Sequence, residues 1–139
     1  MNAKTRENLL TSLRGEAFAY AKYMLFAERA RRSGRPEIAT LFEETARTEL
    51  SEHFAEEAEL ARLAGDDLVN LRDALGGESY EVETMYREFA DQARAAGDTA
   101  AAERFEEVRR DEEGHRAAFR AALERLELET QFAGAPPIA

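Results

Sequence analysis

The chain has 139 residues, enough for one domain with a hydrophobic core, and 44% of them are hydrophobic. It contains no cysteine, which excludes a disulfide, a thiolate-bound iron or zinc and a cysteine nucleophile. The net charge of −10 disfavours binding to nucleic acid or to an anionic membrane. No apolar run approaches the roughly 18 residues of a membrane span, and the first residues lack a signal-peptide core. We therefore expect a soluble, cytoplasmic protein.

Four stretches of the sequence have helical periodicity. The first covers 5–33 and ends at a glycine; the second begins at a proline, a good first-turn residue, and covers 36–64. The third covers 66–96, also before a glycine, and the fourth covers 99–130. We expect an all-α domain over residues 1–131, made of hairpins 5–64 and 66–130, followed by an irregular tail at 132–139.

The two halves of the sequence repeat each other. Near the start of each half the matching residues are 62 positions apart, and further along they are 63 apart. Each half therefore predicts a helical hairpin with a glutamate near the middle of each helix, and two such hairpins fit a four-helix bundle. The matches at 62 are Asn8-Leu9 with Asn70-Leu71 and Gly15-Glu16 with Gly77-Glu78; those at 63 include Tyr23, Phe26, Gly34, Phe42 and Glu49 with Tyr86, Phe89, Gly97, Phe105 and Glu112.

Glutamates and histidines at repeated positions indicate a metal site. Glu112 and His115 are three residues apart and so lie on one helix face, where a carboxylate and an imidazole can hold the same ion. In the first half a histidine, His53, likewise follows a repeated glutamate. Burying four carboxylates in a bundle requires compensation, which two divalent cations supply. Oxygen and imidazole ligands without sulfur favour iron or manganese. The candidate ligands are Glu16, Glu49, His53, Glu78, Glu112 and His115.

Three further residues have two interpretations each. Glu81 lies three residues after Glu78, and Ala19 occupies the matching place in the first half, so Glu81 is either an extra carboxylate ligand or a surface residue. Tyr23 and Tyr86 match in the repeat. Their phenols either hydrogen-bond a ligand carboxylate or pack in the core, and both can hold.

The segments NLLTSLRGEA, LFEETARTELSEH, GGESYEVETMYREFA and FEEVRRDEEGH resemble the di-iron domain of rubrerythrins, in the ferritin-like superfamily. The resemblance implies a ferritin-like four-helix bundle with two iron ions, with manganese possible in one or both positions. It implies that the repeated glutamates and His115 are ligands, and that Glu81 binds one iron in the oxidised state. It further implies reduction of hydrogen peroxide. The lack of cysteine makes the chain similar to the short erythrins without a rubredoxin domain, with an external, rubredoxin-like electron donor.

The sequence departs from the rubrerythrin pattern in the first half. His53 follows Glu49 by four residues rather than three, and Glu52 stands at the third. Either a π-type turn restores His53 to the metal, or Glu52 takes its place.

The connection between the second and third helices is too short for a ferritin-like monomer. In that fold these two helices run parallel, so the chain must return along the bundle over some 35–40 Å at about 1.5 Å per residue. The few residues around Gly65 span about 10 Å. We therefore expect a domain-swapped homodimer, in which each bundle takes one hairpin from each chain. The alternative is that residues 66–77 uncoil and just reach, against which their helical pattern repeats that of the first helix.

Three functions follow from these observations. The first is a di-iron peroxidase that protects against oxidative stress. The second is a ferroxidase or iron-handling protein that uses O₂. The third is a non-enzymatic helical module with a vestigial metal site.

Overall fold

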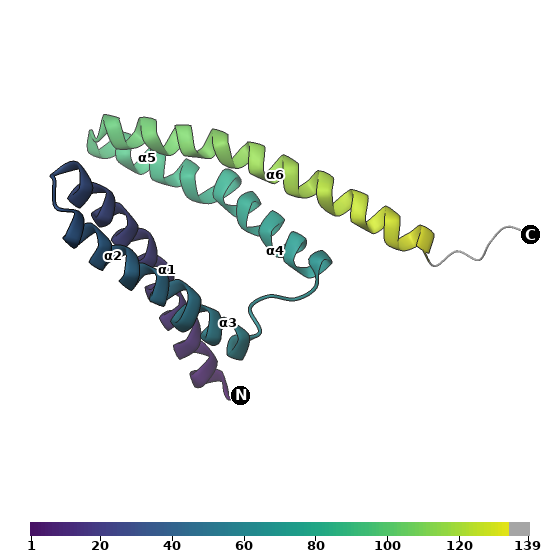
Figure 1. Cartoon of the computed structure of the whole chain (residues 1–139). Coiled ribbons are helices and arrows are strands. Elements are labelled where there is room, and N and C mark those ends of the chain that lie inside the picture. Colours follow the sequence, from purple (N-terminus) through teal and green to yellow (C-terminus); the bar gives the residue numbers. More distant parts are fainter. Residues whose placement is uncertain (134–139) are drawn as a thin grey trace, which may run out of the picture. The chain divides into compact units, whose positions relative to one another are not determined.

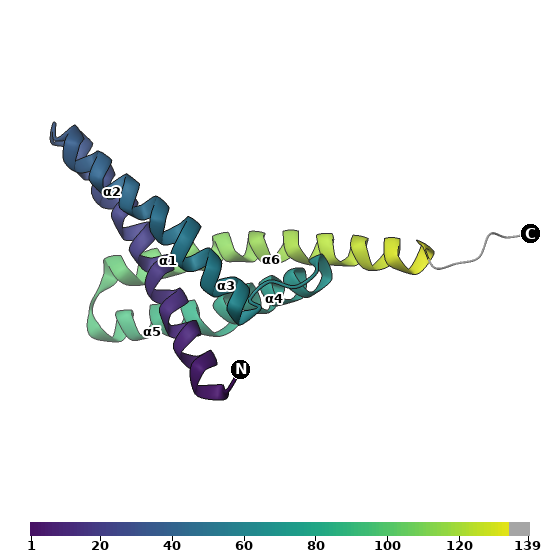
Figure 2. The same ribbon diagram turned by 60° about the horizontal axis from the view of Figure 1, so that its bottom comes forward.

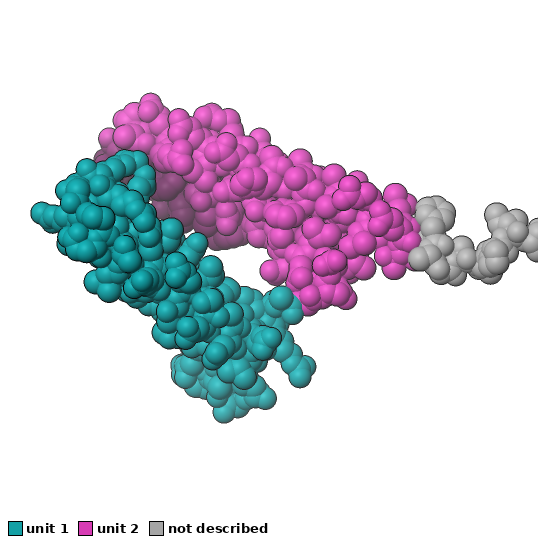
Figure 3. All heavy atoms as spheres, viewed as in Figure 1, with its two compact units in different colours: residues 1–64 teal, residues 65–139 magenta. Residues whose placement is uncertain are grey.

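The computed structural model describes residues 1–133, which form helices and short connections without a strand. The all-α class expected from the sequence is confirmed. The chain divides into two compact units, residues 1–64 and the residues from 65 onward (Figure 3), and each is described by itself. No helix among the described residues is both long and apolar enough to cross a membrane.

The first unit is an antiparallel hairpin, in which one long helix lies beside three consecutive helical segments (Figures 1 and 2). Asn2 caps the long helix by accepting a hydrogen bond from the Thr5 amide at 2.8 Å. The hairpin turns at Gly34, whose φ of 71° favours glycine, and Pro36 then begins the return. The segments are α1 (Ala3–Arg32), α2 (Pro36–Thr48), the π-helix η1 (Glu49–Phe54) and α3 (Ala55–Ala61).

The second unit repeats this hairpin, but its π-helix lies on the first arm of the hairpin rather than on the second. Asp66 caps the first helix by accepting from the Val69 amide at 2.9 Å, and the hairpin turns at Gly97, with φ 83°. The segments are α4 (Asp67–Tyr80), the π-helix η2 (Glu81–Met85), α5 (Tyr86–Ala96) and α6 (Thr99–Ala133). Helix α6 therefore includes residues 132–133, which the sequence analysis assigned to an irregular tail, and residues 134–139 lie outside the described part.

Small buried residues let the two arms of each hairpin approach closely. Ala39 and Ala46 on α2 and Ala90 on α5 are fully buried. An aromatic trio closes the turn end of each hairpin, with ring centroids 5.4–6.4 Å apart in the first unit and 5.6–6.4 Å in the second. The trios are Tyr23, Phe26 and Phe42, and at the matching positions Tyr86, Phe89 and Phe105.

Each hairpin is also tied by an ion pair at matching positions. Arg31 on α1 pairs with Glu43 on α2, and Arg94 on α5 pairs with Glu106 on α6 at 2.6 Å. Both carboxyl pKa values lie below their ordinary value because the guanidinium group donates hydrogen bonds to the carboxylate. The repeat in the sequence is thus also a repeat in packing. The two arms contact each other in the same register in both hairpins.

Candidate metal centre

The first candidate metal group lies midway along the first hairpin. Glu16 comes from α1, and Glu49 and His53 come from η1; their ligand atoms all lie within 4.8 Å of one another. The His53 Nδ1 atom is 2.7 Å from Glu49 Oε2 and 3.7 Å from Glu16 Oε2. Both carboxylates are half-buried, whereas the histidine is exposed. Two carboxylates and one imidazole therefore converge on a single point.

The π-helix is what brings His53 into this group. The wider turn of a π-helix accommodates one more residue than an α-turn. His53, four residues after Glu49, thereby reaches the same kind of position as His115, three residues after Glu112. Glu52 is exposed and is not part of the group. The structure thus shows the π-turn alternative, while the ligand role of His53 remains a prediction.

The second group has the same composition and is built on regular helix. Glu78 lies on α4, and Glu112 and His115 lie on α6, with all ligand atoms within 4.8 Å. The His115 Nδ1 atom is 2.6 Å from Glu112 Oε2 and 3.8 Å from Glu78 Oε2. Glu78 Oε2 is buried and has no hydrogen-bond partner among the described residues. An orphaned carboxylate oxygen beside a second carboxylate is the arrangement that a cation relieves.

The pKa values of the group members reflect crowded negative charge. Hydrogen bonding with Glu49 raises the pKa of Glu16, and burial followed by hydrogen bonding with Glu112 raises that of Glu78. The neighbouring glutamate in turn raises the pKa of each histidine through a hydrogen bond. Without a cation each group therefore favours protons, and a divalent cation can replace them. The donor set of oxygen and imidazole nitrogen fits iron or manganese.

The remaining candidates lie close by but outside the groups. Glu81 begins η2 and is half-buried, and its negative charge contributes to the raised pKa of Glu78. Tyr23 and Tyr86 belong to the aromatic trios, which supports core packing. Burial, and then the charges of Glu81 and Glu112, raises the pKa of Tyr86. The ligand role of Glu81 and a hydrogen-bonding role for the two phenols remain predictions.

Two features of the site were missed in the sequence. The π-helix η2 has a signal there: the repeat offset changes from 62 at Glu16 and Glu78 to 63 at Tyr23 and Tyr86, so the second half has one extra residue between them. The second feature is a hydrogen bond between Ser12 and Glu57, for which the sequence holds no signal.

All-helical chains with paired glutamate–histidine groups are typical of helical-bundle proteins that bind metals through carboxylates and imidazoles, and the comparisons identify the family. The family model described as Rubrerythrin matches residues 7–54 and 49–123. The chain belongs to the rubrerythrin family, as the resemblance in its sequence indicated.

Named relatives support this assignment. The chain is 34% identical to nigerythrin of Nitratidesulfovibrio vulgaris over 85% of its own length and 65% of that protein. It is 32% identical to rubrerythrin of Clostridium perfringens, covering 89% and 72%, and 33% identical to rubrerythrin of Porphyromonas gingivalis, covering 90% and 68%. The chain thus spans about two thirds of the length of these relatives. A solved structure described as "Mixed valant state of nigerythrin" matches with 32% identity, 91% of this chain, 69% of that chain and a TM-score of 0.46.

Proposed function

We propose that the two groups hold a pair of iron ions and that the protein is an oxidoreductase that reduces hydrogen peroxide. The observation that carries the proposal is the convergence of two glutamates and one histidine in each hairpin. Family membership supports iron as the metal and peroxide as the oxidant. Manganese in one or both positions is the alternative, and metal analysis of the purified protein distinguishes the two.

In this proposal each residue of the groups has a definite role. Glu16 and Glu78 would hold one ion each, and Glu49 and Glu112 would help to hold both ions and neutralise their charge. A ferrous pair held there would provide the two electrons that reduction of peroxide to two water molecules requires, with two protons taken up from solvent. His53 and His115 would complete the two positions, and Glu81 would be the extra carboxylate for the oxidised state.

We further propose that each bundle is shared between two chains. From Glu49 to Ala61 and from Asp67 to Glu78 the helices extend about 35 Å in total at about 1.5 Å per residue. The connection from Ala61 to Asp67 spans at most roughly 22 Å. If the two arms run parallel, as the ferritin-like fold implies, one chain cannot bring both groups to the same depth. A domain-swapped homodimer removes this difficulty.

Light scattering after size exclusion tests this assembly, with a dimer as the expected result. Insertion of a flexible linker of about 15 residues after Gly65 lets both hairpins of one chain meet, so the variant is expected to become monomeric and still bind two ions. A monomeric unmodified chain would contradict the swap.

Electrons are proposed to come from a rubredoxin-type protein, because no cysteine is available for a thiolate-bound iron. The cytoplasmic location stays a prediction.

Anaerobic loading with ferrous iron tests the activity. Two ions per bundle are expected, followed by rapid growth of diferric absorbance on mixing with peroxide and much slower growth with O₂. The variant His115→Ala is expected to lose iron, whereas Glu113→Gln, an exposed neighbour, is expected to behave as the parent. A reaction confined to O₂ would favour a ferroxidase instead, and failure of the parent to bind iron would leave a helical module without metal chemistry.

A further inference from the structure

One carboxylate near the first metal group has no role in the proposed chemistry. Glu57 on α3 lies four residues after His53, and its Oε1 atom accepts a hydrogen bond from Ser12 Oγ at 2.9 Å. Ser12 on α1 lies four residues before Glu16. The pair thus bridges the two arms of the hairpin about one helical turn from the metal group.

The second oxygen of Glu57 is buried without compensation. Glu57 Oε2 has no hydrogen-bond partner among residues 1–133, and the other buried side-chain oxygen in that state is Glu78 Oε2, in the second metal group. No lysine or arginine within the described residues forms an ion pair with Glu57. A buried carboxylate oxygen without a partner is costly even when the other oxygen accepts a hydrogen bond, so its presence favours a positive charge nearby.

A helix N-terminus does not supply that charge. Glu57 is in the first turn of α3, but α3 continues directly from η1, and the residue before it, Phe54, has helical φ and ψ. The amides of that turn are therefore part of a continuous helix rather than free donors. The group formed by Glu16, Glu49 and His53, about one helical turn away along the chain, can attract a cation.

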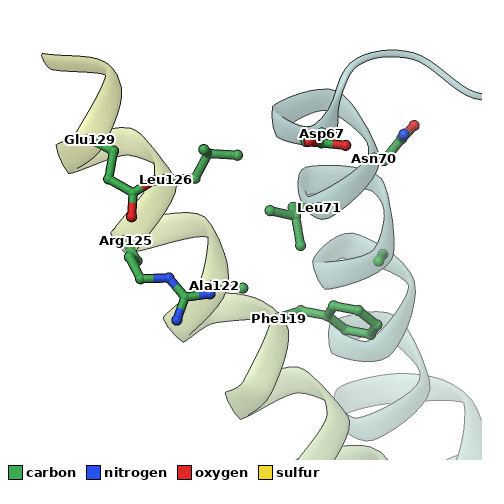
Figure 4. A pocket seen from close by; sticks show the side chains of 9 residues that line it. Asp67, Asn70, Leu71, Phe119, Ala122, Arg125, Leu126 and Glu129 are labelled. Atoms are coloured by element: carbon green, nitrogen blue, oxygen red, sulfur yellow. The ribbon is translucent and has the colours of Figure 1, made fainter. Parts of the chain in front are cut away.

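The second hairpin has no counterpart of this pair. At an offset of 62 the matching residues are Ala74 and Phe119, which are apolar. They line a cavity of about 450 Å³ between α4 and α6, together with Leu71 and Leu126 (Figure 4). The hairpins thus have equivalent metal groups with different extra carboxylates: Glu57 lies one turn from the first group on α3, whereas Glu81 lies beside the second group at the start of η2.

We infer that Glu57 is a positioning residue that strengthens cation binding at the first metal group, so that the two groups bind their ions with unequal affinity. The inference rests on the proposed metal function. A cation at Glu16 and Glu49 lowers the cost of the buried Glu57 carboxylate, and by linkage that carboxylate lowers the free energy of the bound cation. The effect is electrostatic and acts without direct coordination.

The test is calorimetric titration of the metal-free full chain with Mn²⁺, a probe that does not undergo oxidation during the experiment. The parent is expected to bind two ions per bundle in two steps. The variant Glu57→Gln keeps the shape and the Ser12 hydrogen bond but removes the charge, and the tighter step is expected to weaken by about tenfold, as for other residues that support ligands from outside. Glu56→Gln, an exposed change of the same charge on the same helix, is the matched control and is expected to leave both steps unchanged.

Thermal melts give a second readout. Removal of an uncompensated buried charge is expected to leave metal-free Glu57→Gln at least as stable as the parent, while Mn²⁺ raises its melting temperature less. Should the Gln variant fail to fold, Glu57→Leu removes the charge and the polar atoms together and carries the same expectation. Equal Mn²⁺ affinities for Glu57→Gln and Glu56→Gln would overturn the inference and leave the proposed function intact. A parent that binds no Mn²⁺ or ferrous iron would instead overturn the proposed function.

Discussion

Deletion of Glu52 tests whether the π-helix η1 exists to align His53. An α-helix rotates about 100° and rises about 1.5 Å per residue. If this segment were a regular α-helix, its one extra residue would rotate His53 and all of α3 by about 100° about the helix axis relative to Glu49. Deletion of Glu52 leaves the histidine three residues after Glu49, the spacing of Glu112 and His115 in regular helix. The contacts of α3 with α1 are then retained without a π-turn.

The expected result is a folded protein with its metal site preserved. The free energy of unfolding is expected to stay within about 1 kcal/mol of the parent, since Glu52 is exposed and no buried contact is lost. Two divalent ions per bundle are expected to bind as before. Chemical denaturation and metal analysis measure the two quantities.

The matched control is deletion of Glu44, which is exposed and lies in the regular helix α2. Here one side of the deletion must rotate by about 100°. Either Phe42 leaves the aromatic trio, at a cost of about 2 kcal/mol or more, or the rotation is taken up by η1 and Glu49 leaves the metal group. Loss of stability or of one metal ion is therefore expected. Equal damage from the two deletions would refute the alignment role of η1.

Three more results are expected. The stability of the metal-free protein should fall from about pH 5 to about pH 8 in thermal melts, because the folded-state pKa values of Glu16, Glu78, His53 and His115 are raised and each group stabilises the fold only while protonated. The affinity for Mn²⁺ should rise over the same range, since binding displaces these protons; a flat profile in calorimetry would contradict this. Arg62→Gly should stabilise the protein by up to about 1 kcal/mol in urea unfolding, because Arg62 ends α3 with φ 51°.

Much of the fold and of the metal groups could be predicted from the sequence because the repeat adds a second, independent copy of each signal. A single glutamate three residues before a histidine is weak evidence in a chain with 29 acidic residues. The same pairing in both halves, with Glu16 and Glu78 at matching depth, makes chance unlikely to produce the pattern. The helix ends were also well marked, since Pro36, Gly34 and Gly97 carry their own backbone preferences.

The features that escaped prediction depend on contacts that a pattern does not encode. Whether Glu57 is solvated depends on where Ser12 points, and no local preference decides that. The prolines of the C-terminal segment predict that the last helix ends at residue 130, whereas the described helix α6 continues for three more residues, to Ala133. The aromatic positions, by contrast, follow directly from periodicity, and the two trios confirm that Phe26 and Phe89 pack in matching places.

The offsets between the two halves explain why the π-helices lie where they do. Matching residues are 62 apart before η2, 63 apart from Tyr23 and Tyr86 to Glu49 and Glu112, and 62 apart again at the histidines. Each change of offset coincides with a π-helix, η2 in the second hairpin and η1 in the first. A single extra residue in each half thus cancels along the chain, so that both ends of the two hairpins keep the same register. Only the level of the metal groups differs between the halves, and there one π-helix contains His53 while the other begins at Glu81. The departures from regular helix are therefore confined to the level of the candidate ligands, which is the distribution expected if π-turns are retained for metal binding rather than for the fold.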